Sequence, residues 1–284
     1  MIASIVWDVK PQIADLGFME LRWYSLLFLL GFIIGYYILS KMFKKEGLSI
    51  ELLDKLTFYV VISTIIGARL GHCIFYEPEI YLRHPLRMIL PFEGTPGKDF
   101  HFTGYQGLAS HGGAIGLLIG LYLYARKFKR PYLWVLDRLA IVTAQAAVLI
   151  RMGNLFNSEI VGTPTNLPWG MKFVRLEPHG TPLDQIVPLH PAQVYESICY
   201  LIIFIFLITL YYKKYPKTRQ GLFIGLFFIL VFTARFFIEF IKDDQVDFEA
   251  GMFLNMGQLL SIPFIIAGII LVFRRSAVPK EGRT

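Results

Sequence analysis

Long runs of apolar residues, separated by short polar segments, dominate the chain. A helix needs roughly 20 residues to cross a hydrocarbon core of about 30 Å, and seven runs approach that length. They cover residues 23–39, 56–76, 108–124, 133–150, 195–212, 222–241 and 254–273. The second and fourth runs are the least regular, because Arg69, Asp137 and Arg138 lie in or near them. The pattern predicts an all-α integral membrane protein with seven transmembrane helices.

Basic residues gather in every second segment between these runs, and this predicts the orientation of the chain. Lysine and arginine in short loops stay on the cytoplasmic side of a membrane. The residues concerned are Lys41, Lys44, Lys45, Arg126, Lys127, Lys129, Arg130, Lys213, Lys214, Lys217, Arg219, Arg274 and Arg275. We therefore expect the N-terminus outside and the C-terminus in the cytoplasm.

Three longer segments face outward in this topology. Residues 1–20 lack the order of a cleavable signal peptide, and we expect them to remain as an interfacial segment on the outer membrane surface. Prolines interrupt residues 77–107, which therefore cannot form one regular helix. Prolines and glycines in residues 157–190 predict a small turn-rich or β-hairpin head subdomain between spans four and five. We expect residues 1–284 as a whole to form a single polytopic membrane domain.

Composition narrows the class further. With 55% hydrophobic and 17% charged residues and a mean hydropathy of +0.53, the chain is neither collagen-like, disordered nor stapled by disulfides. The net charge of +7 does not indicate nucleic acid, because the basic residues alternate with the spans. Cys73 and Cys199 lie in apolar runs and are interpreted as small core residues. The histidines have no metal-ligand spacing, so no metal site is expected.

Five polar side chains within the spans share one depth. Ionisable groups inside a membrane are costly unless they are paired or hydrated, so each is a candidate functional residue. The five are Tyr24, His111, Arg151, Arg235 and Glu239. The predicted topology brings all of them to the interfacial depth of the outer leaflet, which indicates a site there.

Two groups of these residues allow alternative interpretations. Arg235 and Glu239 share a helix face, either as an intrahelical ion pair or with Glu239 holding a guanidinium that binds an anion. The end of the fourth span is denser in polar groups. It holds Arg151, Asn154, Asn157, Glu159 and Gly162. This segment is either an interfacial helix cap or an anion-binding site.

Two further motifs begin spans three and five. His111 precedes glycines at 112, 116 and 120, a small-residue face that lets another helix approach closely. The histidine is either a satisfied interfacial residue or a neutral base near pH 7. Residues 190–196 begin with His-Pro and end with Glu196. We interpret that segment as the structural N-terminus of a helix.

An ordered set of short motifs resembles one known family. The motifs are Leu21-Arg22-Trp23-Tyr24, Gly67-Ala68-Arg69-Leu70-Gly71, Ser110-His111-Gly112-Gly113, Arg151-Met152-Gly153-Asn154 with Asn157 and Glu159, His190-Pro191-Ala192-Gln193-Val194-Tyr195-Glu196, Arg235-Phe236-Phe237-Ile238-Glu239 and Met256-Gly257-Gln258-Leu259-Leu260-Ser261. The chain resembles the bacterial phosphatidylglycerol:prolipoprotein diacylglyceryl transferases over nearly its whole length.

This resemblance implies an enzyme of the bacterial cytoplasmic (inner) membrane. It would transfer the diacylglyceryl group of phosphatidylglycerol to the lipobox cysteine thiol of a prolipoprotein and release glycerol 1-phosphate. Its partners would be phosphatidylglycerol, prolipoproteins and membrane lipids, with no cofactor and no nucleic acid. The site would lie in the outer leaflet.

Roles for the site residues follow as hypotheses. Arg151 and Arg235 would bind the phosphate and offset its charge as it leaves, and Asn154 and Asn157 would donate hydrogen bonds to phosphate or glycerol oxygens. Glu239 would orient Arg235, and Glu159 would orient Arg151 or the incoming peptide. Gly162 would permit a turn near the site. His111 would accept the thiol proton, with Tyr24 either a competing candidate for this base or a hydrogen-bond partner.

Two rival classes remain at this stage. Paired intramembrane arginines also suit a channel or transporter for anions, but the inner halves of the spans are mostly apolar, which argues against a continuous aqueous path. A scaffold or lipid-binding protein without catalysis would tolerate Arg151→Lys, whereas a site that depends on a bidentate guanidinium would not.

Overall fold

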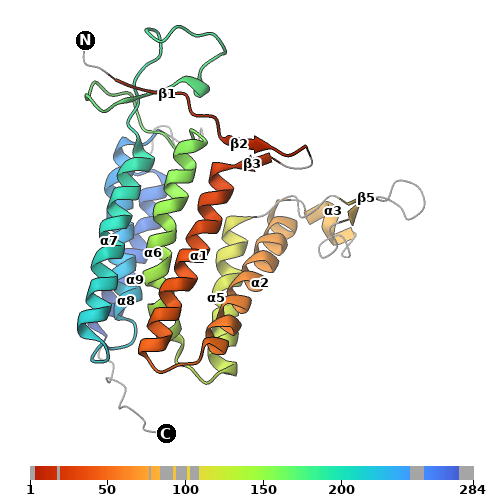
Figure 1. Ribbon diagram of the computed structural model, residues 1–284, viewed down its shortest axis with the longest axis vertical. Helices are drawn as coiled ribbons and strands as arrows, with labels where there is room; N and C mark the ends of the chain where they lie inside the picture. Colours follow the sequence, from red (N-terminus) through yellow and green to blue (C-terminus); the bar gives the residue numbers. More distant parts are fainter. Residues whose placement is uncertain are drawn as a thin grey trace. The chain divides into compact units, whose positions relative to one another are not determined.

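The computed structural model (Figure 1) describes residues 4–17, 20–76, 78–83, 92–93, 101–102, 109–243 and 253–274. The chain divides into two compact units, and each is considered by itself. The first unit comprises Met1–Leu39 and Leu136–Thr284, and the second comprises Ser40–Val135. Helices α1 (Trp23–Lys45) and α6 (Tyr132–Phe156) contribute residues to both units.

Each predicted span corresponds to a helix. The remaining helices are α2 (Ile50–Phe75), α5 (Ser110–Lys127), α7 (Ala192–Lys214), α8 (Leu222–Ile238) with the 3-10 turn η2 (Glu239–Ile241), and α9 (Met256–Phe273). Six helices in the described part of the chain are long and apolar enough to cross a membrane. Helix α5 is not among them, because its glycines and its polar ends lower its hydropathy. These six helices support a multi-pass membrane protein, and α5 as the seventh transmembrane helix remains a prediction.

Several helices extend beyond the apolar runs that predicted them. Helix α1 continues to Lys45 and α7 to Lys214, where basic side chains in the last turn interact favourably with the helix dipole. Helix α6 continues to Phe156, so Arg151 lies inside the helix and not at its outer end as expected. The hydrophobic pattern placed this helix end too early, because Arg151 and Asn154 are polar and yet helical.

Tight contact between α2 and α5 organises the second unit. A Cβ built on Gly71 would lie 2.6 Å from the Cα of Gly112, and one built on Gly116 would lie 2.7 Å from the Cα of Gly67. These glycines allow the two backbones to touch, which confirms the packing role expected of the repeat after His111. Arg69 of α2 is buried and donates to the Tyr81 hydroxyl over 3.2 Å.

A polar contact between helices explains why Asp137 lies in a span of the first unit. Its buried carboxylate accepts hydrogen bonds from the backbone N–H groups of Gly221, at 2.8 Å, and Ile224, at 3.0 Å. Both groups belong to the start of α8, which has no acceptor of its own there. Helices α8 and α9 then pack closely, with the rings of Phe232 and Phe264 stacked 4.3 Å apart.

The two cysteines differ in burial. Cys73 is fully buried in α2, as expected of a small core residue. Cys199 in α7 is only half-buried, so the core interpretation fits it less well. Neither cysteine forms a disulfide within the described part of the chain.

Short strands occur in the described parts of the segments that the sequence placed outside. The first 22 residues contain β1 (Ile5–Trp7), β2 (Gln12–Asp15) and β3 (Glu20–Arg22), and β2 pairs with β3 in antiparallel fashion. Residues 157–190 contain β6 (Met171–Phe173) and the 3-10 turn η1 (Val174–Leu176). Strand β6 pairs in parallel with β1, so this segment takes its strand partner from the N-terminal segment. Isolated bridges alone link its own residues, which favours the turn-rich alternative over a regular hairpin.

The segment from residue 77 to residue 107 is described only in part. It contains α3 (Pro78–Arg83) and an antiparallel pair formed by β4 (Phe92–Glu93) and β5 (His101–Phe102). It is therefore not one continuous helix, as its prolines predicted. The described residues of this segment belong to the second unit.

Candidate active site

A buried carboxylate, that of Glu196, is contacted by two cations in the first unit. Its Oε2 lies 2.7 Å from Nε of Arg151 on α6, and its Oε1 lies 3.0 Å from Nζ of Lys242, just after η2. Glu196 itself is fully buried near the start of α7. A buried charge is stable only when it is paired, so these contacts determine where all three side chains lie.

The ion pairs continue through Lys242 to the end of α8. Lys242 Nζ also lies 3.0 Å from Oε2 of Glu239, and the same Oε2 lies 4.0 Å from Nε of Arg235. The cluster of Arg151, Glu196, Lys242, Glu239 and Arg235 is called the charged cluster below. It contains three cations and two carboxylates, so its formal charge is one positive.

The three cations of the charged cluster differ in their access to solvent. The side chain of Lys242 is 3% exposed, that of Arg151 16% and that of Arg235 35%. Lys242 lies between two carboxylates and serves to hold them together. Arg235 has the longest ion-pair distance and the largest exposed fraction, so it is the cation best placed to bind an added anion.

Hydrogen bonds link Arg151 to the polar residues at the end of α6. Its Nη1 donates to Oδ1 of Asn154 over 3.2 Å, and Nδ2 of Asn154 donates to Oε2 of Glu159 over 3.1 Å. Nδ2 of Asn157 donates to Oε1 of the same carboxylate over 3.0 Å. Asn154 therefore links Glu159 to Arg151 through hydrogen bonds. A helix cap at the membrane interface would not by itself explain this network of side chains.

Gly162 separates two backbone segments that approach very closely. Its N–H donates to the His190 carbonyl oxygen over 2.8 Å, and the N–H of Thr163 donates to that of Ile241 over 2.9 Å. A Cβ at Gly162 would lie 2.6 Å from Cβ of His190. Gly162 thus fixes the backbone beside Lys242, which is a structural requirement more specific than the turn expected from the sequence.

Gly257 plays a comparable part on α9. A Cβ built there would lie 2.9 Å from Cγ of Glu239 and closer still to its carboxylate. Helix α9 therefore covers Glu239 so closely that an added methyl group would displace the Glu239 side chain. Its start is secured by Asn255 and Gln258, whose side chains each bond to the other's backbone N–H.

Tyr24 lies on α1 against a third glycine of the first unit. A Cβ at Gly153 would lie 2.8 Å from Cδ2 of the Tyr24 ring, which places the phenol beside the turn of α6 that carries Arg151 and Asn154. The neighbouring Trp23 ring stacks on Phe156 at 5.0 Å. This arrangement brings Tyr24 to the region of α6 that contributes to the charged cluster.

His111 belongs to the second unit, whereas the charged cluster belongs to the first. It is the second residue of α5, and its side chain is exposed. Arg69 and Tyr76 lie in the same unit as His111. Arg69 packs on the Tyr81 ring, 4.8 Å from its centroid, in agreement with helix pairing. Tyr76 stacks on His72 and stays largely exposed.

Sequence reasoning missed two members of the charged cluster. The sequence predicted that Glu196 stabilises the N-terminus of a helix from within its first turn, and this was wrong. Glu196 lies beyond the first turn of α7, and its carboxylate contacts Arg151 and Lys242. Lys242 follows Glu239 by three residues, a spacing that favours side-chain contact and was the available signal. In the described ranges, no three potential metal ligands come together.

Comparison with known proteins agrees with the resemblance drawn from the motifs. The family model described as prolipoprotein diacylglyceryl transferase matches residues 11–274. A Bacteroides fragilis protein named phosphatidylglycerol–prolipoprotein diacylglyceryl transferase is 44% identical over 273 residues, which are 96% of each chain. Proteins with the same name from Porphyromonas gingivalis and Tolumonas auensis are 45% and 42% identical, and they cover 96% and 94% of this chain and 95% and 96% of their own. The chain belongs to the prolipoprotein diacylglyceryl transferase family.

Proposed function

We propose that the charged cluster is where this transferase moves the diacylglyceryl group of phosphatidylglycerol to the lipobox cysteine of a prolipoprotein. In this reaction the cysteine sulfur attacks the glyceryl carbon that carries the phosphate ester. A C–S bond forms, and the C–O bond to the phosphate breaks with its electron pair. The products are a thioether-linked diacylglyceryl peptide and glycerol 1-phosphate, and the thiol proton passes to a base.

The observation that carries this proposal is the single excess positive charge of the cluster. The phosphodiester of phosphatidylglycerol has one negative charge, and the leaving phosphomonoester gains a second as the C–O bond breaks. Cations held in place before the reaction stabilise such developing charge without having to reorganise. The Glu196 and Glu239 carboxylates hold the cations, since each contacts two of them.

Individual roles follow from these contacts. Arg235, the most exposed cation, and Arg151 bind the phosphate, with Asn154 fixing the plane of the Arg151 guanidinium. Asn157 and Glu159 extend the same network toward the incoming peptide or the glycerol. Lys242 keeps the two carboxylates together and is a positioning residue.

The thiol needs a base because its usual pKa of about 8.5 leaves it mostly protonated at neutral pH. His111 and Tyr24 are the two candidates. Tyr24 lies against Gly153, two residues after Arg151 of the charged cluster. His111 is exposed at the start of α5, with an imidazole whose usual pKa suits proton transfer near pH 7.

The proposed setting is the bacterial cytoplasmic membrane. Seven spans with the N-terminus outside put the charged cluster and His111 at the outer leaflet, where secreted prolipoproteins and phosphatidylglycerol meet. The alternating basic segments support this orientation. The segment of residues 157–190 and the N-terminal strands then form an outer head.

A reconstitution experiment tests the proposal. Purified protein in phosphatidylglycerol liposomes receives a lipobox peptide, and peptide mass and released glycerol phosphate are both followed. We expect a diacylglyceryl mass gain with equal glycerol phosphate release, lost in Arg151→Ala and Arg235→Ala and retained in Arg175→Ala, whose side chain is exposed in η1.

Tyr24→Phe and His111→Ala identify the base in the same assay. Loss in only one of them, with recovery at higher pH where the peptide thiol ionises by itself, assigns the proton transfer to that residue. Full activity of Arg151→Ala and Arg235→Ala would show that the charged cluster is not the phosphate site.

A further inference from the structure

A second region of the molecule has the features of a lipid-binding site. Helices α2 and α5 of the second unit enclose an open groove of about 560 Å³. Its floor is formed where Gly67 and Gly116 bring the two backbones together. Ile66 and Ile115 are both more than half exposed along its rim. The groove is therefore long, shallow and apolar, as an acyl chain requires.

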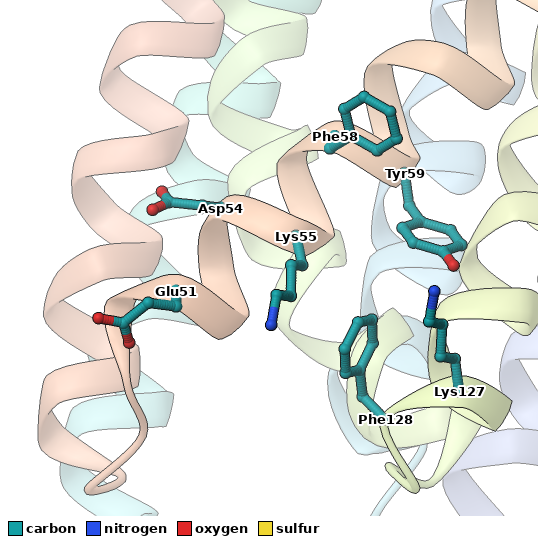
Figure 2. A pocket seen from close by; sticks show the side chains of 7 residues that line it. All are labelled: Glu51, Asp54, Lys55, Phe58, Tyr59, Lys127 and Phe128. Atoms are coloured by element: carbon teal, nitrogen blue, oxygen red, sulfur yellow. The ribbon is translucent and has the colours of Figure 1, made fainter.

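A pocket of about 580 Å³ with charged and aromatic side chains in its wall continues this groove toward the N-terminus of α2 and the C-terminus of α5 (Figure 2). Phe58 and Tyr59 line both the pocket and the groove, so the two cavities share a boundary. This end of the helix pair carries the basic residues that predict the cytoplasmic side. Aromatic and basic side chains are typical of the level at which lipid headgroups lie.

The charges in this pocket are separated in space. The ammonium groups of Lys55 and Lys127 lie 5.4 Å and 6.0 Å from the centroid of the Phe128 ring. Figure 2 shows this ring between the two lysines, while Glu51 and Asp54 project on the far side of Lys55. Two cations and two carboxylates line the pocket, so its formal charge is zero but its charges are arranged as a dipole.

A purely structural explanation covers only part of this arrangement. Glu51 and Lys55 are four residues apart on one helix, a spacing that favours a solvated ion pair. That pair does not explain why Lys55, from α2, lies over the Phe128 ring at the end of α5, or why an apolar groove begins at Phe58.

We propose that this pocket and groove bind a zwitterionic membrane phospholipid with a primary ammonium in its headgroup, of the phosphatidylethanolamine type. The phosphate lies at Lys55 and Lys127, and the ammonium lies at the Glu51 and Asp54 carboxylates. One acyl chain follows the groove away from Phe58.

Charge complementarity favours this occupant over an anionic lipid. An anionic headgroup would pair with the lysines and bring a net negative charge beside two carboxylates. A primary ammonium has three N–H donors for those carboxylates, whereas a quaternary ammonium has none.

The part of the groove from Phe58 to Gly67 suits an acyl chain of one leaflet, and the groove itself continues to Phe75. Half of a hydrocarbon core of about 30 Å corresponds to roughly ten helical residues at about 1.5 Å each. Counted from Phe58, that depth reaches Gly67, where the glycine contact with Gly116 forms the floor. The leaflet is the cytoplasmic one, which rests on the proposed orientation of the chain.

Photocrosslinking tests the identity of the bound lipid. The photoreactive residue p-benzoylphenylalanine replaces Phe58 in the pocket or, as a control, Phe206, an exposed residue of α7. Each protein is placed in nanodiscs with equal amounts of phosphatidylethanolamine, phosphatidylcholine and phosphatidylglycerol with identical acyl chains. After irradiation, mass spectrometry counts the adducts of each lipid.

We expect about fivefold more phosphatidylethanolamine than phosphatidylcholine adduct at position 58, the ratio for about one net hydrogen bond, and equal amounts at position 206. Glu51→Gln with Asp54→Asn abolishes this preference, and Lys55→Gln with Lys127→Gln lowers all adducts at position 58. Lys213→Gln with Lys214→Gln at the end of α7 changes neither, and retained transferase activity shows that each variant is folded.

Three outcomes would overturn the proposal. They are an excess of phosphatidylglycerol adduct at position 58, lipid ratios identical at positions 58 and 206, and crosslinks from position 58 to a second protein chain. The first indicates an anionic site, the second a bulk lipid surface, and the third a protein interface.

Discussion

Lys242 and Glu196 are brought together from positions 46 residues apart in the chain, with Nζ and Oε1 at 3.0 Å in a fully buried setting. The same carboxylate contacts Arg151. Glu196 therefore joins α6, α7 and the end of α8, and it positions two of the three cations of the charged cluster.

Removing the charge of Glu196 tests whether its carboxylate stabilises the charged cluster. We expect Glu196→Gln to destabilise the protein by about 3–5 kcal/mol, because the substitution leaves buried cations without a full counter-charge. Thermal unfolding in detergent measures this, with the exposed Glu177→Gln as the matched control. Transferase activity should fall in parallel. Equal melting temperatures for both variants would contradict the buried ion pairs.

Arg151→Lys separates charge from geometry. A lysine keeps the positive charge but cannot contact Glu196 and Asn154 at once through a planar fork. We expect kcat/KM to fall on the order of 10²-fold, as for the loss of one transition-state hydrogen-bond donor. Initial rates with the lipobox peptide provide the measurement, and Arg175→Lys is the control. A rate within about twofold of the unmodified enzyme would show that a positive charge is sufficient at this position without the guanidinium geometry.

Gly257→Ala tests the cover over Glu239. The added methyl would collide with the Glu239 side chain, and overpacking of this kind costs about 1–3 kcal/mol. We expect a lower melting temperature and reduced activity, because Glu239 must move away from Lys242. Gly31→Ala on α1 is the matched control, since its nearest neighbours would be 3.5 Å away. A Gly257→Ala variant as stable as Gly31→Ala would show that α9 can shift to make room for the methyl group.

Asp137→Asn tests the contact that secures the start of α8. The carboxylate accepts from two backbone N–H groups, and its charge favours both bonds. We expect a loss of about 1–2 kcal/mol of stability with KM for the peptide unchanged, because Asp137 does not contact the charged cluster. Asp184→Asn, at an exposed position, should have no effect. A selective rise in KM would instead indicate a role in substrate binding.

Much of the helical framework could be predicted because it depends on local properties of the sequence. An apolar run of about 20 residues must become a helix in a membrane, since every backbone polar group has to be satisfied within the segment. The runs therefore located the helices to within a few residues at most ends. The spacing of Gly112, Gly116 and Gly120 likewise predicted a close contact with another helix.

The ends of helices and the outer strands depended on longer-range contacts. Arg151 and Asn154 look like the end of a span, yet they remain helical because Glu196 and Glu159 satisfy them. Strand β6 finds its partner in β1, more than 150 residues away, so no local pattern could reveal the pairing.

The sequence by itself determined the class of protein, the positions of the helices and most members of the candidate site, because hydropathy and motif spacing are properties of short segments. Only the tertiary structure decided that Glu196 and Lys242 complete the charged cluster, and that Glu239 has Lys242 as its nearest cation. The physical reason is that the cost of burying a charge depends on which partners surround it in space. Those partners come from three helices that the sequence alone does not place together.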